Sequence, residues 1–226
     1  MNKFRIKRTR ILLILLLGTV AITAFSLQPK TYICVDDVIC LADYVKVIDK
    51  NENPVTGLVR ATRKDGKVLY EGMYKNGERD GVHKSYSFFG KLMSEGSYEN
   101  GNAVGVHKTY YENGQLKAEG SFENGKENGI YKEYYNNGRL EKEMNMKDGK
   151  IDGFLKTYYP YGQLAGHRIY EDGKLKIEKS YYDNGQLKLD VKYEAKYEGD
   201  YDRVEKVYDE RGHLLEKKII KNGRLY

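Results

Sequence analysis

Several ingredients of a compact enzyme are scarce in this chain of 226 residues. It contains no tryptophan, three prolines and two cysteines, and no stretch shows capped helical periodicity. No Cys–His or Ser–His–Asp arrangement can be placed, and no glycine-rich loop leads into a helix to hold phosphate. The sequence therefore predicts a non-catalytic protein without cofactor or metal, in which the many carboxylates form ion pairs with lysine.

Acidic residues are missing from residues 1–26, where five basic side chains precede the apolar run 11–17. This order is typical of a signal peptide or, if uncleaved, of an N-terminal membrane anchor helix. We expect the rest of the chain to lie outside the cytoplasm, either secreted, periplasmic or anchored. That remainder has 34 basic and 33 acidic residues, a balance that gives no electrostatic footprint for nucleic acid.

The two cysteines, Cys34 and Cys40, lie in segment 27–56, which we interpret as an N-terminal cap. In an oxidising compartment they can close a small disulfide-bonded loop. Two unpaired thiols are the alternative.

A repeat of about 24 residues fills the chain from residue 57 to residue 226. Its seven units start at residues 57, 81, 105, 129, 153, 176 and 203. Such a period marks a repeat array, in which each unit buries apolar surface against its neighbours. The unit that starts at Gly105 holds two hairpin signals, Asn113-Gly114 and Asn124-Gly125, between short runs rich in strand-forming residues. The sequence predicts an all-β fold, an elongated single-layer array of antiparallel β-hairpins with type I′ turns.

The turns also predict a strand register. A two-residue loop at Asn113-Gly114 places Lys108 opposite Glu119, and favourable cross-strand pairs stabilise a sheet by roughly 0.2–1 kcal/mol each. The same construction pairs Arg60 with Glu71, Lys84 with Glu95, Lys132 with Glu143 and Lys179 with Asp190, whereas the pairs Lys156–His167 and Lys206–Lys217 break the rule.

Alternation of side chains then sorts the residues onto two faces. One face carries rings such as Tyr74 and Tyr98, and Gly72 and Gly96 leave room on it for a ring to lie flat on the backbone. The opposite face carries an apolar column that includes Val82, beside a column of lysines and a column of tyrosines.

The lysine and tyrosine columns form the predicted partner-binding surface, because tyrosine offers wide and rigid contact area. Their members are Lys84, Tyr86, Lys108, Tyr110, Lys132, Tyr134, Lys156, Tyr158, Lys179 and Tyr181. The alternative is that these columns only hold the sheet together. His83 and His107 share a repeat position, but equivalent strands lie about 10 Å apart, so we expect partly exposed strand residues rather than zinc ligands.

The repeated pattern Gly-x-x-Lys-x-Tyr-Tyr-x-Asn-Gly, seen in residues 105–114 and 129–138, resembles the bacterial variant of the MORN repeat. The resemblance covers residues 57–226, and many bacterial members look like the YwqK-like antitoxin group. It implies a single-layer β-hairpin array that contacts proteins or membrane surfaces and has no catalysis of its own.

Three functions are compatible with these observations. The first is an exported or membrane-anchored repeat protein that mediates protein–protein or cell-surface interactions. The second is an antitoxin or immunity-like protein that neutralises a partner toxin by direct binding. The third is a glycan-binding surface protein, since exposed aromatic rings also suit sugars.

Overall fold

The computed structural model describes residues 2–7, 16–18, 31–35, 46–48, 53–195, 201–221 and 224–226. The chain divides into two compact units: unit 1 comprises residues 1–114 and 122–125, and unit 2 comprises residues 115–121 and 126–226. Every regular element among the described residues is a β-strand. The predicted all-β hairpin meander is therefore confirmed within each unit.

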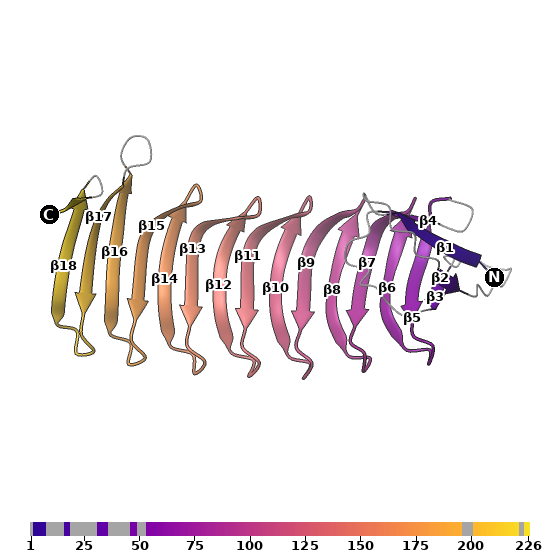
Figure 1. The fold of residues 1–226 in the computed structure, drawn as a ribbon, viewed down its shortest axis with the longest axis horizontal. Coiled ribbons are helices and arrows are strands. Elements are labelled where there is room, and N and C mark those ends of the chain that lie inside the picture. The colour runs from indigo at the N-terminus through magenta and orange to yellow at the C-terminus, as the bar shows by residue number, and fades with distance from the viewer. Residues whose placement is uncertain are drawn as a thin grey trace. The chain divides into compact units, whose positions relative to one another are not determined.

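Unit 1 contains a meander of five antiparallel strands, coloured purple to pink in Figure 1. Its strands are β5 (Gly57–Thr62), β6 (Val68–Lys75), β7 (Glu78–Tyr86), β8 (Leu92–Glu99) and β9 (Asn102–Tyr110). A further strand, β3 (Thr31–Val35), pairs with β5 in parallel, so the free edge of β5 is occupied.

The first 48 residues are described only in part. The described segments are extended: β1 (Asn2–Lys7) pairs with both β2 (Leu16–Gly18) and β4 (Lys46–Ile48). The rest of the predicted N-terminal helix lies outside the described residues. So does Cys40, and the disulfide and the domain boundaries stay predictions.

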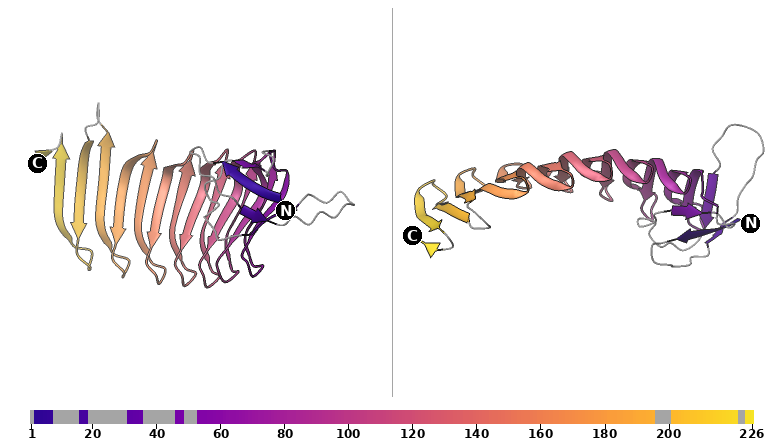
Figure 2. Two further views of the ribbon diagram at one scale, coloured as in Figure 1. Left: turned by 45° about the vertical axis from the view of Figure 1, so that its right-hand side comes forward. Right: turned by 90° about the horizontal axis from the view of Figure 1, so that it is seen from above.

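Unit 2 is a longer meander of the same kind, pink to yellow in Figure 1. Its strands are residues 116–121 of β10 (Leu116–Glu123), then β11 (Lys126–Tyr134), β12 (Leu140–Lys147), β13 (Lys150–Tyr158), β14 (Leu164–Glu171), β15 (Lys174–Tyr181), β16 (Leu187–Ala195), β17 (Tyr201–Tyr208), β18 (Leu214–Lys221) and β19 (Arg224–Leu225). Seen from above in Figure 2, β11 to β18 form a single layer, as the sequence predicts. Among the described residues of unit 2, both faces of this sheet are therefore covered by the sheet's own side chains.

The two turns of each repeat have different conformations. At the second turn both central residues have positive φ, for example Asn124 at 50° and Gly125 at 78°, which confirms the predicted type I′ geometry. The first turn was predicted to be the same, and this prediction is wrong. At Asn137-Gly138 only the glycine has positive φ, at 81°, and its N–H donates to the carbonyl of Tyr135.

This first turn is a three-residue loop, in which a type I turn is followed by a glycine that forms a β-bulge. A second irregularity shifts the register between Tyr134, which pairs with Leu140, and Glu133, which pairs with Lys142. It compensates for the extra loop residue, so the strands beyond it have the register that a two-residue loop would give. Lys132 lies opposite Glu143 as predicted, and the pairs Arg60–Glu71, Lys84–Glu95, Lys179–Asp190, Lys156–His167 and Lys206–Lys217 are confirmed as cross-strand neighbours. Lys108 belongs to unit 1 and Glu119 to unit 2.

Tyrosine hydroxyls connect successive hairpins in unit 2. The hydroxyl of Tyr135 donates to the carbonyl of Tyr158 at 2.7 Å, and that of Tyr159 donates to the carbonyl of Tyr181 at 2.8 Å. Tyr182 continues the series with the carbonyl of Tyr208 at 2.9 Å. Each repeat is therefore held by its neighbour, as expected of a repeat array.

Candidate functional site

The predicted lysine and tyrosine columns lie on one face of the sheet in each unit, here called the lysine face. Along its middle runs a row of charged side chains, the central row. In unit 1 the central row consists of Arg60, Glu71, Lys84, Glu95 and Lys108, one from each strand. The charge changes sign at every strand, and two of its predicted ion pairs form: Arg60–Glu71 at 3.0 Å and Lys84–Glu95 at 4.0 Å.

The central row of unit 2 is less regular. From β11 onward it consists of Lys132, Glu143, Lys156, His167, Lys179, Asp190, Lys206 and Lys217. Glu143 lies opposite Lys132 but forms its ion pair with Lys156 instead, at 3.6 Å. A glutamate thus bonds to the lysine of the following hairpin, which links one repeat to the next.

The tyrosine column is fixed by the same glutamates. Each of four tyrosine hydroxyls donates to the carboxylate of the glutamate 15 residues earlier: Tyr86 to Glu71, Tyr110 to Glu95, Tyr134 to Glu119 and Tyr158 to Glu143, at 2.7 to 2.9 Å. Burial, and then the bond to Glu71, raise the pKa of the Tyr86 hydroxyl to about 12. The hydroxyl therefore stays protonated and keeps donating at neutral pH.

These bonds favour a structural role for the tyrosine hydroxyls and leave the rings half-buried. Whether the columns bind a partner stays a prediction. The sequence held a signal for these bonds, because a glutamate and a tyrosine recur 15 residues apart in four successive repeats. It was missed because directly opposed pairs were considered and contacts with the following hairpin were not.

Beside the central row lies an apolar column that remains accessible. Val82 and Val106 in unit 1 are each 52% exposed, and Ile130 in unit 2 is 41% exposed. A second exposed apolar feature, missed by sequence reasoning, is the turn that contains Phe88 and Phe89, which are 61% and 70% exposed. Large side chains exposed on a fixed backbone are the kind of surface that protein partners use.

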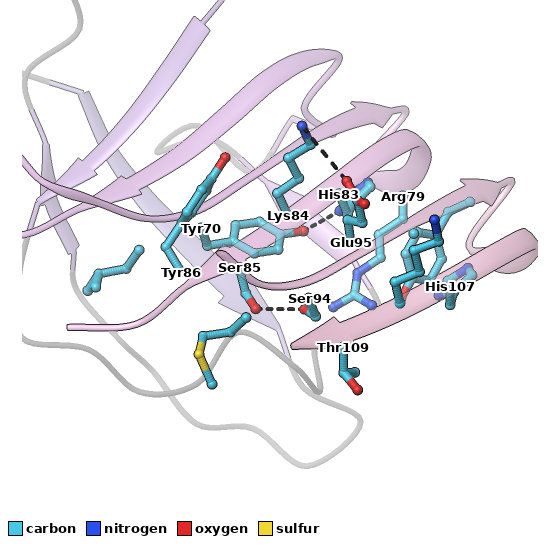
Figure 3. Close-up of a pocket in the computed structure, with 15 residues that line it drawn as sticks. Tyr70, Arg79, His83, Lys84, Ser85, Tyr86, Ser94, Glu95, His107 and Thr109 are labelled. Carbon is cyan, nitrogen blue, oxygen red and sulfur yellow. Dashed lines mark hydrogen bonds and ion pairs between the residues drawn. The ribbon is translucent and has the colours of Figure 1, made fainter. Parts of the chain in front are cut away.

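The opposite face, here called the core face, contains a pocket of about 530 Å³ in unit 1. Figure 3 shows Ser85, Ser94, Thr109 and Arg79 on this side of the strands and the Lys84–Glu95 ion pair on the other. The Ser85 and Ser94 hydroxyls are hydrogen-bonded at 2.6 Å. The rings of Tyr70, Tyr98 and His107 also line the pocket, and the Arg79 guanidinium lies 4.9 Å from the centre of the Tyr98 ring.

His83 lies at the centre of this wall and is 5% exposed, so the prediction of a partly exposed histidine is wrong at this position. Its ring rests on the backbone of Gly72, where a Cβ would come within 2.2 Å of Nδ1. Nε2 donates to the carbonyl of Met73 at 2.7 Å, and Nδ1 accepts from the hydroxyl of Tyr70. Tyr70 in turn bonds to the hydroxyl of Tyr74 at 2.8 Å. Both nitrogens are engaged, so neither is available to a metal.

Burial, assisted by the positive charge of Arg79, lowers the pKa of His83 to about 4. The same burial raises the pKa of the Tyr70 phenol above its usual range. His83 is therefore neutral, as an acceptor at Nδ1 requires. His107 repeats the arrangement half-buried: its ring rests on Gly96 and its Nε2 bonds to the carbonyl of Ser97 at 2.9 Å.

The fold and its two faces define a class of protein: an open β-hairpin repeat protein whose lysine face presents ordered side chains. The comparisons agree with this class. The family model described as the MORN repeat variant matches residues 79–100, 103–124, 127–148 and 176–195. These four stretches are therefore similar to MORN repeats, a type of repeat that is generally involved in contacts with proteins or membranes. No curated protein matches the sequence, and the narrower assignment to the YwqK-like antitoxin group stays a prediction.

Within the part of the chain that the structure describes, no helix has the length and apolar character needed to cross a membrane.

Proposed function

We propose that this is a non-catalytic binding protein, exported or membrane-anchored, whose lysine face contacts another protein or a cell-surface component. The observation that carries the proposal is the exposure of Val82 and Val106 beside side chains that are already fixed. Tyr86 and Tyr110 are hydrogen-bonded to the preceding hairpin, so little conformational entropy is lost when a partner binds them.

The basic start of the chain and the apolar run 11–17 support export or anchoring. The balanced charge of the repeats supports a protein or cell-surface partner over a nucleic acid. An absence of enzymatic activity is part of the proposal, since the most distinctive buried groups, His83 and Tyr70, bond to each other.

A photocrosslinking residue at Val106 in the full chain, expressed in its own cells, tests the proposal. We expect a defined crosslinked product from Val106 and none from Lys67, an exposed turn residue placed as control. Equal crosslinking from both positions, or none from Val106, would contradict the assignment of the lysine face.

Cell fractionation tests the location of the protein, and recovery of the uncleaved chain only from the cytoplasm would overturn export.

A further inference from the structure

The lysine face of unit 2 carries a concentration of positive charge that the fold does not need. In unit 1 the central row alternates in sign, but in unit 2 two positions where an acid would continue the alternation hold His167 and Lys217 instead. Lys206 and Lys217 are directly opposed across β17 and β18. Like charges in this arrangement destabilise a sheet, so the pair has no structural benefit.

A further lysine lies beside the central row. On β16 the exposed Lys192, two residues from Asp190 on the same face, lies opposite Ile177 and Val204. We call Lys179, Lys192, Lys206 and Lys217 the lysine patch. In the central row and the two rows beside it, Asp190 is the one acid that the described part of β15–β18 presents on this face. Four lysines against one aspartate leave an excess of three positive charges.

The acids of these strands lie elsewhere. Glu178, Glu205 and Glu216 are on the core face, where they bond to Arg168 at 2.6 Å, Arg203 at 3.7 Å and Lys218 at 2.8 Å. Glu194 and Asp202 are on the lysine face but at the far ends of β16 and β17, opposite each other. Charge is therefore balanced on the core face and unbalanced in the lysine patch.

In the central row, the neighbour of the lysine patch on β14 adds no compensating charge. His167 lies opposite both Lys156 and Lys179, and its pKa is lowered by burial and then by these two lysines, so it stays neutral. One carboxylate oxygen of Asp190, Oδ1, is buried without a hydrogen-bond partner. Like charges on such a surface repel one another in the free protein, so binding of an external anion stabilises it.

The spacing of the lysine patch favours an extended peptide as the anion. Lys179 on β15 and Lys206 on β17 are separated by two strand spacings, about 9.6 Å. A polyproline II chain rises about 3.1 Å per residue, so every third residue advances about 9.3 Å. Tyr181 and Tyr208 lie beside these lysines with the same spacing, and aromatic side chains are what proline-rich peptides pack against.

We propose that the lysine patch binds an extended acidic segment of a partner protein, with a carboxylate at every third residue, running across β15 to β18. This inference rests on the proposed function and names the chemistry of its partner. Charge supplies the attraction, and the interval between Lys179 and Lys206 selects the period of the peptide. Lys217, directly opposite Lys206 on the next strand, adds its charge to the same end of the interval. A polyanion without this period matches the charge of the lysine patch but not the spacing of its lysines.

Two synthetic peptides of identical composition test the proposal with the full chain. One is (Glu-Pro-Pro)4, and the other has four contiguous glutamates followed by eight prolines. By fluorescence anisotropy we expect the periodic peptide to bind about tenfold more tightly, with an affinity that falls as salt is added. Equal binding of the two peptides, no binding of either, or tighter binding of a single-stranded RNA of equal charge would each overturn the proposal.

A matched pair of variants locates the site. Lys217→Glu alters the lysine patch and is expected to weaken binding of the periodic peptide about tenfold. Lys218→Glu makes the same change of charge one residue away on the core face and should leave binding unchanged. Thermal melting of both variants checks folding, and equal losses of binding in both would contradict the site. If Val106 still crosslinks to a partner while the peptides fail, this inference falls and the proposed function stands.

Discussion

The core faces of the two units are built on different residues, although both units use the same hairpin. In unit 1 a ring rests on a glycine, as His83 does on Gly72 and His107 on Gly96. In unit 2 this arrangement occurs once, where Tyr131 rests on Gly120, and the next equivalent cross-strand pairs are Met144 with Leu155 and Arg168 with Glu178. The same backbone position therefore accepts a ring on bare backbone, two aliphatic side chains or an ion pair.

The comparison shows that the repeat specifies its backbone more strictly than its core. Positive φ at the type I′ turns and alternation along the strands recur in both units. What fills the core face needs only to match in volume and polarity across neighbouring strands. The consequence is a difference in chemistry: the core of unit 1 contains a buried histidine, while Met144, Met146 and Leu155 in unit 2 form an apolar cluster.

The largest expected effect lies in the apolar cluster of unit 2. Leu155→Ala removes a side chain that is 8% exposed and packed against Met144 and Met146. We expect the free energy of unfolding to fall by about 2–4 kcal/mol, as for other buried leucines. Urea denaturation followed by circular dichroism measures it. Val82→Ala, at an exposed position in unit 1, is the control and should cost less than about 0.5 kcal/mol.

In unit 1 the corresponding test adds a methyl group instead of removing one. Gly72→Ala places a Cβ against the His83 ring, which is held at both nitrogens. Overpacking of this kind costs about 1–3 kcal/mol. Adding His83→Ala should recover part of the loss, because the clash disappears with the ring. A double variant less stable than the sum of the two single changes would show that the ring does not rest on Gly72.

The titratable ring makes the stability of unit 1 depend on pH. The unfolded chain protonates its histidine near pH 6.5, whereas folded His83 protonates near pH 4. Between these values the unfolded state binds more protons, so the free energy of unfolding falls as the pH is lowered from 6.5 to 4, by at most about 1.4 kcal/mol per pH unit. Chemical denaturation at several pH values measures the slope. His83→Gln should flatten it, and an unchanged slope in this variant would assign the effect to another group.

The smallest expected effect is an increase in stability. Lys217→Glu restores the alternation of the central row opposite Lys206 and should raise the free energy of unfolding by roughly 0.2–1 kcal/mol. Thermal melting at low salt detects it, and the gain should shrink as salt is added. A loss of stability would indicate that the Lys206–Lys217 contact is not repulsive.

Local rules were sufficient to predict the hairpins, the faces and most of the register. Asn124-Gly125 requires positive φ at both residues, and period-two alternation separates Val82 from His83 whatever the tertiary contacts are. The first turn could not be predicted so simply, because an Asn-Gly pair suits both a two-residue loop and a type I turn with a bulge. Beyond the register shift at Glu133 and Tyr134, the two-residue loop and the type I turn with a bulge give the same strand register.

At the candidate site, the contacts of long side chains could not be predicted from the sequence, because such side chains can reach more than one neighbouring strand. The carboxylate of Glu71 is opposite Arg60 but also reaches Tyr86 on the next strand, and no pairing rule states which contact dominates. The burial of His83 depends on Tyr70 and Met73 from a neighbouring strand, so its exposure could not be read from its own strand. The sequence predicts that a ring lies on Gly72, but only the structure shows that this ring is that of His83.

The central claim is that residues alternate in role along each strand. Those on the core face stabilise the fold, and those on the lysine face are exposed for contact with a partner. Hydroxyl-radical labelling of the native full-length chain, read by mass spectrometry, tests it directly. Corrected for intrinsic reactivity, Met73 should label several-fold faster than its neighbour Tyr74, which is 3% exposed, and Met144 and Met146 should be protected. Equal labelling of Met73 and Tyr74, or fast labelling of Met144, would contradict the assignment of the faces.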